Sequence, residues 1–211
     1  MTKAYCLNAK FTVLPERKDE FLSIIQNDKK MTLDTEPLAL QFVVGEDTER
    51  PGTFHLHEQY IGERGFQQHI ETKHFAEWNK FCESKPFTED GEPEVQFFTG
   101  EHAPQKIASR KAFCLNVEIC PTNDVLPEFK SVIENNAKGS TEDEVLCLQY
   151  NWGESTTDPG AFYFHEQYTG DDDGKEGFDT HAKTPHFDVW DKFAAKNPFA
   201  KPPVVSFYRT L

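Results

Sequence analysis

The sequence predicts an α+β protein in which two ferredoxin-like βαββαβ repeats pack sheet to sheet as a pseudo-two-fold α+β barrel within one chain. The first observation is an internal repeat: residues 3–62 align with residues 111–170 without a gap, with 26 identities in 60 positions. The second is the order of strand and helix patterns in each copy, β-α-β-β-α-β. The third is that such a sheet carries helices on one face only, so a second copy can cover the other face.

The elements of the first repeat follow from its residue patterns. Alternating apolar residues bounded by Gly and Pro predict strands, which cover residues 3–13, 37–45, 53–60 and 93–99. Apolar residues at helical spacing, such as Phe21, Ile24 and Ile25, predict helices, which cover residues 16–30, 64–71 and 73–84. In the second repeat, Thr184 followed by Pro185 is a favoured helix start. We therefore expect repeats at 1–100 and 111–211, joined by a polar linker at 101–110.

Composition and charge limit the possible partners. The 22 basic and 36 acidic residues give a net charge of −14, which argues against nucleic acid and anionic membranes as partners. No run of about 18 apolar residues is present, and the first ten residues lack the pattern of a signal peptide, so a cytoplasmic protein is expected. The five cysteines are odd in number and form no C-x-x-C motif, which indicates free thiols in a reducing compartment.

Side-chain alternation divides the third strand of each repeat into two faces. Phe54, Leu56, Glu58 and Tyr60 share the face expected under the helices, and the second repeat places Glu166 and Tyr168 in the same way. The opposite face, which carries His57 and Gln59, is expected at the junction of the two halves.

A carboxylate among apolar neighbours needs a partner. By topology, the nearest candidates are His69 for Glu58 and His181 for Glu166. We predict that each pair is the acid–base element of a pocket; the alternative is a Glu–His bond that only orients a helix.

Other residues recur around this stretch and are predicted to contact a substrate. They are a strand Asn, a strand Tyr, and a His and aromatic residues near a helix start: Asn8, Tyr60, His74, Phe75 and Trp78 in repeat 1, and Asn116, Tyr168, His186, Phe187 and Trp190 in repeat 2. Structural roles are the alternatives. The Asn side chains could bond to backbone, the His could cap or pack at the helix start, and the aromatic residues could belong to the core.

Metal and nucleophile chemistry have weaker support. His55-x-His57 with His69 and His74 offers enough nitrogen ligands for a metal. However, position 55 is Tyr163 in the second repeat, and the strand His and Glu residues face opposite ways. No metal site and no cofactor are therefore predicted. No Ser or Cys stands in a recognisable nucleophile setting, and no phosphate-binding or dinucleotide-binding Gly motif is present.

At these residues the chain resembles the antibiotic biosynthesis monooxygenase family. The shared pattern is Glu-x-Tyr at the end of a strand, then His-x-x-Thr-Pro-His-Phe, seen at 181–187; the first repeat has Lys73 in place of Pro. The resemblance covers both halves and implies the dimeric α+β barrel, here within one chain, with a pocket between sheet and helices in each half.

The resemblance also implies a set of activities. Some family members oxygenate phenolic or quinol-type substrates with dioxygen and no cofactor, and this is the function expected here. Relatives with the same motif isomerise small phosphorylated sugar-derived ligands, and others bind and degrade haem. Asn8 matches the strand Asn of the haem branch, but the haem-ligating His would fall at Asn79 and Asp191. The alternatives are an isomerase of a small polar metabolite and a non-catalytic, ligand-binding or stress-related barrel. Whether both halves are active is open.

Overall fold

The computed structural model describes residues 3–100 and 111–211, so the predicted linker at 101–110 lies outside the described residues. Repeat 1 contains β1 (Ala4–Thr12), α1 (Lys18–Thr35), β2 (Ala39–Asp47), β3 (Thr53–Tyr60), α2 (Gly62–Ile70), α3 (Lys73–Glu83) and β4 (Glu94–Gly100). Repeat 2 contains β5 (Phe113–Pro121), α4 (Leu126–Asp143), β6 (Cys147–Glu154), β7 (Phe162–Tyr168), α5 (Lys175–His181), α6 (Pro185–Ala194) and β8 (Phe199–Thr210). Among the described helices, none has the length and apolar character needed to cross a membrane.

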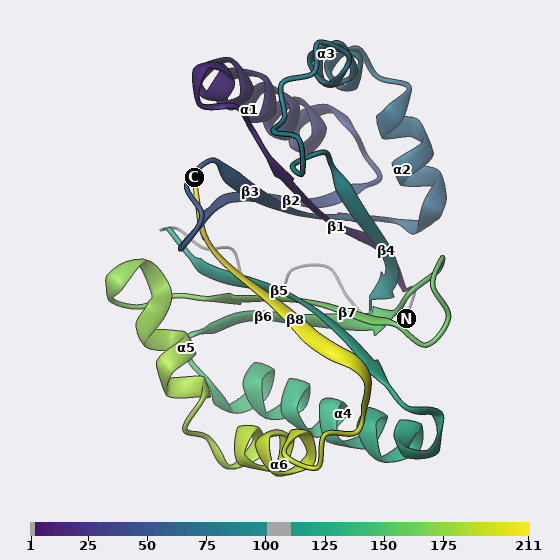
Figure 1. Cartoon of the computed structure of the whole chain (residues 1–211), viewed down its shortest axis with the longest axis vertical. Coiled ribbons are helices and arrows are strands. Elements are labelled where there is room, and N and C mark those ends of the chain that lie inside the picture. Colours follow the sequence, from purple (N-terminus) through teal and green to yellow (C-terminus); the bar gives the residue numbers. More distant parts are fainter. Residues whose placement is uncertain (1–2, 101–110) are drawn as a thin grey trace.

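The eight strands form one antiparallel sheet in the order β4-β1-β3-β2-β8-β5-β7-β6. The two repeats join where β2 pairs with β8, with Gly45 opposite Thr210. The edge strands β4 and β6 approach each other at an isolated bridge between Phe98 and Ser155. The sheet therefore curls into a nearly closed barrel, with the helices of each repeat on its outside (Figure 1). The predicted fold is confirmed.

Each repeat has its own core between helices and sheet. In repeat 1, Phe21 and Ile25 of α1 pack against Phe54 and Leu56 of β3, and the rings of Phe21 and Phe54 lie 4.4 Å apart. Repeat 2 builds the same cluster from the equivalent positions of α4 and β7. This packing confirms that the face of β3 with Glu58 lies under the helices. Burial of these apolar side chains stabilises each half by about 1.5–3 kcal/mol per residue.

The opposite faces of β3 and β7 meet at the seam between the two halves. The rings of His57 and His165 stack there, with centroids 3.8 Å apart and planes 9° from parallel. Asn8 Oδ1 lies 2.8 Å from His57 Nδ1, and Asn8 Nδ2 donates to the backbone oxygen of Phe164 in the other half at 2.9 Å. The predicted position of His57 at the junction is therefore confirmed.

Asn116 repeats this arrangement from the other side. Its Nδ2 donates to the backbone oxygen of Leu56 at 3.1 Å, and its Oδ1 lies 2.9 Å from His165 Nδ1. The prediction that Asn8 and Asn116 contact a substrate stays a prediction: both lie outside the helix-covered cavities, but they line a separate cavity at the seam. Both side chains face the seam, because each is paired across the strands with the seam-facing His of its own half.

The buried ring pair at the seam makes stability sensitive to acid. Burial lowers the pKa of His57 to about 3, and burial followed by the nearby His57 lowers the pKa of His165. Because the unfolded chain takes up these protons below about pH 6.5, the stability contributed by the neutral rings is lost as pH falls from 6.5 towards 3. We expect wild type to lose about 2 kcal/mol relative to His57→Gln between pH 6.5 and 5 in urea titrations. Equal pH slopes for both proteins would contradict this.

Candidate functional site

A cavity lies between the sheet and the helices of each repeat. The cavity of repeat 1 has a volume of about 190 Å³, and its lining includes Asp28, Glu58, Phe75 and Trp78. The cavity of repeat 2, about 240 Å³, is lined by residues that include Glu166, His181, Phe187 and Trp190. Four of the predicted substrate-contacting residues line these cavities, namely Phe75, Trp78, Phe187 and Trp190, whereas Tyr60, Tyr168, His74 and His186 do not. Each cavity combines an aromatic wall with a buried carboxyl group.

The strand carboxylate of each cavity is bound by a tyrosine two residues further along the strand. Tyr60 donates its hydroxyl hydrogen to Glu58 Oε2 at 2.6 Å, and Tyr168 does the same for Glu166 at 2.6 Å. Burial raises the pKa of Glu58 to about 7, and it also raises the pKa of Glu166. A carboxyl group with a pKa near 7 can take up or release a proton at neutral pH.

A second carboxylate, which is partly buried, binds both predicted histidines of repeat 1. Glu36 Oε1 accepts hydrogen bonds from His69 Nδ1 at 2.8 Å and from His74 Nε2 at 2.6 Å. These three residues, here called the Glu36 cluster, come from the C-terminal end of α1, the last turn of α2 and the first turn of α3. Thr72 caps the start of α3 by accepting a hydrogen bond from Phe75 N. The two histidines therefore lie on separate helices, and both can face Glu36.

The Glu144 cluster of repeat 2 has the same geometry. Glu144 Oε1 accepts hydrogen bonds from His181 Nδ1 at 2.8 Å and from His186 Nε2 at 2.5 Å. Burial would raise the pKa of Glu144, but the hydrogen bonds from the two histidines outweigh burial and hold that pKa below its usual value. The carboxylate is therefore ionised and joins three helices at one point.

The predicted Glu–His pairs are brought to one region but are not directly bonded. Among the described residues, Glu58 is hydrogen-bonded to Tyr60, and His69 to Glu36 and Thr32. Burial is the main influence on the pKa of Glu58, and the charge of nearby His69 acts against it. The Glu–His bond that orients helices does exist, but its carboxylate is Glu36.

Sequence reasoning missed Glu36, Glu144 and Asp28. A signal existed for the first two, because Glu36 and Glu144 occupy the same position in both repeats at the shift of 108 residues. Helix α1 continues to Thr35, five residues beyond its predicted end, and this extension carries Glu36 to the two histidines. Residues 29–35 contain few apolar side chains, so periodicity did not reveal the last turn.

The two cavities differ at one buried polar position. Asp28 in repeat 1 corresponds to Asn136 in repeat 2, whose Nδ2 donates to the hydroxyl of Tyr150 at 3.1 Å. Repeat 1 has Phe42 at the position of Tyr150, so Asp28 has no equivalent tyrosine hydroxyl to bond with. Burial raises the pKa of Asp28 to about 6.

Solved structures share this architecture. A protein of Lactobacillus acidophilus described as a candidate monooxygenase superposes with a TM-score of 0.81 at 17% identity, over 98% of this chain and 94% of that one. One of Fusobacterium nucleatum with the same description gives 0.84 at 14% identity, over 100% and 93%. An anthrone oxidase-like protein gives 0.63 at 10% identity, over 100% and 92%. At these identities the likeness is one of fold.

Sequence comparison identifies the family. No curated protein matches the chain significantly. The family model for antibiotic biosynthesis monooxygenase matches twice, over residues 4–80 and 112–192, which together cover most of both repeats. The chain therefore belongs to the antibiotic biosynthesis monooxygenase family, as a tandem repeat of its domain.

Proposed function

We propose that the chain is a monooxygenase that oxidises a small phenolic or quinol-type substrate with dioxygen and without a metal or organic cofactor. Family membership supports the general monooxygenase function. The observation that carries the finer proposal is the buried Glu58, whose pKa burial raises to about 7, at the wall of a cavity lined by aromatic side chains. Glu166 is its counterpart in repeat 2.

In the proposed reaction, the substrate ring lies against Phe75 and Trp78 and its hydroxyl group faces Glu58. The ionised Glu58 takes the hydroxyl proton, because a positioned base with a pKa near the working pH is efficient. The phenolate then donates electrons to dioxygen at a ring carbon that carries hydrogen. One oxygen atom stays on that carbon as the new quinone carbonyl. The other leaves as water with the two protons released by the substrate.

The histidines of the clusters complete the acid–base element in this proposal. Glu36 fixes the orientation of the His69 ring through Nδ1, as Glu144 does for His181. His181 lines the same cavity as Glu166, whereas His69 lies outside the lining of the repeat 1 cavity. In each repeat the charge of the histidine favours the ionised form of the strand carboxylate without a direct bond to it.

The cavities also bear on the alternative functions. Of the described residues, no Lys or Arg lines either cavity, which argues against a phosphorylated metabolite as substrate. The cavities of about 190 and 240 Å³ are also not filled by side chains, as a purely structural barrel would require.

Oxygen uptake with a panel of phenols and quinols tests the proposed function. We expect at least one substrate to consume dioxygen, and we expect His69→Ala and His181→Ala each to remove the share contributed by its own half. Asp34→Asn, an exposed residue of α1, is the control and should leave uptake unchanged. Absence of uptake with every phenol and quinol would refute the proposed function.

A further inference from the structure

Two buried polar atoms beside the cavity of repeat 1 have no hydrogen-bond partner. They are His69 Nε2 and Asp28 Oδ1, in side chains that are 1% and 3% exposed, and no described residue bonds to either atom. Leaving a buried polar atom without a hydrogen-bond partner destabilises the folded chain. Because native proteins rarely leave such atoms without a partner, their presence points to an occupant that both can bind.

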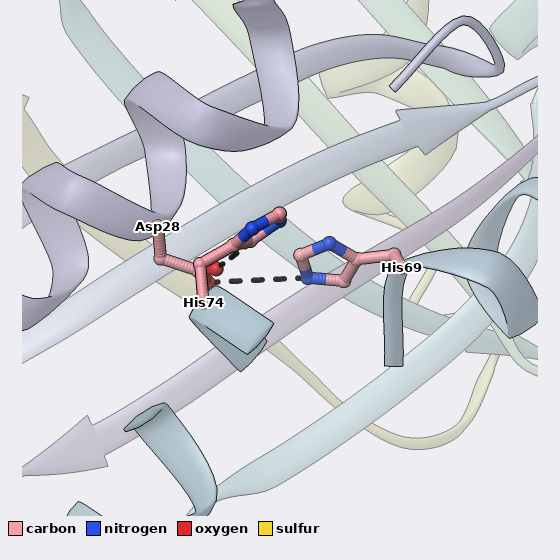
Figure 2. Close-up of side chains that lie close together, drawn as sticks. All are labelled: Asp28, His69 and His74. Atoms are coloured by element: carbon pink, nitrogen blue, oxygen red, sulfur yellow. Dashed lines mark ion pairs between the residues drawn. The ribbon is translucent and has the colours of Figure 1, made fainter. Parts of the chain in front are cut away.

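The two side chains face each other together with His74. His69 Nε2 lies 3.9 Å from Asp28 Oδ2, and His74 Nε2 lies 4.0 Å from Asp28 Oδ1. Figure 2 shows the three side chains converging from α1, α2 and α3. One ligand atom from each lies within 4.8 Å of the others. These gaps are too long for hydrogen bonds and leave room for a small ion between the side chains.

We infer that Asp28, His69 and His74 form a binding site for one divalent transition-metal ion, of which Zn²⁺ is the probe. Two imidazole nitrogens and one carboxylate oxygen are a ligand set that such ions take. Metal–ligand bonds of about 2.0–2.2 Å place ligand atoms about 3–3.5 Å apart. The three side chains would therefore move closer together on binding, by about half an ångström for the two pairs that include Asp28 and by up to about 1.3 Å for the two histidines.

The hydrogen bond from His69 to Glu36 orients His69 for metal binding. Glu36 accepts the hydrogen on His69 Nδ1, which leaves the lone pair on Nε2 directed to Asp28. A carboxylate behind a metal-binding histidine is the common way to fix its tautomer and raise its basicity. When the ion binds, His74 Nε2 gives up its hydrogen bond to Glu36 and coordinates the ion instead. The hydrogen bond between Glu36 and His69 is retained.

We infer the site for repeat 1, although Glu144, His181 and His186 of repeat 2 also bring one ligand atom each within 4.8 Å of one another. In repeat 2 the position of Asp28 is Asn136, a neutral amide whose Nδ2 is bonded to Tyr150. The only carboxylate of the repeat 2 group is Glu144, which is hydrogen-bonded to both rings, whereas repeat 1 has Asp28 in addition to the equivalent Glu36. The ligand set also differs from the one weighed on the sequence, because His57 lies at the seam.

The inference predicts binding of one Zn²⁺ per chain. The full chain, freed of metal with a chelator, is titrated with Zn²⁺ by calorimetry and with Co²⁺ by visible absorption, which reports ligand geometry. Asp28→Asn installs the residue that repeat 2 carries, so folding should persist, as a thermal melt will show. We expect this variant to weaken Zn²⁺ binding by at least about 100-fold. Asp34→Asn, on the exposed face of the same helix, is expected to bind as wild type does.

Three results would overturn the inference. One is the absence of any Zn²⁺ or Co²⁺ binding by wild type at micromolar ion concentration. Another is equal binding by wild type and Asp28→Asn. The third is a stoichiometry of two, because this would place an ion in repeat 2 as well. None of these readouts depends on catalytic activity, so a failure of the metal site can be distinguished from a failure of the proposed function.

Discussion

Replacing Glu144 by Ala is expected to lower the free energy of unfolding by about 3 kcal/mol or more. Glu144 is 8% exposed and accepts hydrogen bonds from His181 and His186, so its removal leaves one buried ring and one partly buried ring without their acceptor. It also removes the contact that ties the end of α4 to α5 and α6. A loss of this size would remove a large part of the stability of an average domain.

The pH dependence of this loss has a definite sign. The pKa of Glu144 in the folded chain lies below its usual value of 4.5. A carboxylate with a lowered pKa contributes stability above its unfolded pKa, and this contribution is lost as pH falls through the folded pKa. The difference between wild type and Glu144→Ala should therefore be full at pH 7 and shrink below about pH 4.5.

Urea unfolding of wild type, Glu144→Ala and the control Glu142→Ala will check this prediction. Glu142 lies on the same helix two residues earlier, is exposed, and is 3.9 Å from Lys138. Exposed pairs of this kind contribute about 0–1 kcal/mol, so the control should unfold almost as wild type does. Similar losses in both variants would show that the Glu144 cluster does not hold the helices together.

Replacing Glu58 and Glu166 by Gln together is expected to lower the rate of oxygen uptake by about 10²–10⁴-fold. Gln keeps the size of the side chain and can still bond to the tyrosine hydroxyl, but it cannot accept the substrate proton. Since only the ionised carboxylate is a base, the activity of the repeat 1 site should rise with pH through about 7, where the pKa of Glu58 lies.

Tyr60→Phe provides a matched control for this role. Tyr60 donates a hydrogen bond to Glu58 at 2.6 Å, and that bond lowers the pKa of Glu58 against the larger effect of burial. In a Glu166→Gln background, Tyr60→Phe should therefore move the midpoint of the pH–rate profile to higher pH and leave the plateau rate nearly intact. An unchanged midpoint would show that Glu58 is not the titrating base.

The fold could be predicted from the sequence because the same pattern of strands and helices occurs twice in the chain. The repeat of 108 residues and the alternation along β3 were enough to place Phe54 and Leu56 under the helices and His57 at the seam. Both features depend on local periodicity, which the residues themselves display.

The features of the site that the sequence did not reveal depend on contacts between separate elements. Asn8 lies directly across from His57 in the sheet, and this register places it at the seam. Register between separate strands is not written in either strand alone. Glu36 was missed because a polar last turn of α1 lacks apolar periodicity, although it carries the carboxylate to His69 and His74. Asp28 lies within the predicted helix at 16–30, and only the packing of three helices brings it next to His69 and His74.

The most direct test of the proposed function measures the consumption of ¹⁸O₂ by protein that a chelator has freed of metal. The substrate is a phenol or quinol that the protein oxidises in the panel. Cofactor-free chemistry predicts that uptake persists after metal removal and that one ¹⁸O atom enters each product molecule. The double variant Glu58→Gln/Glu166→Gln should lower the rate of uptake by about 10²–10⁴-fold. Uptake that disappears on chelation and returns when a metal ion is added, or a double variant as active as wild type, would contradict the central claim.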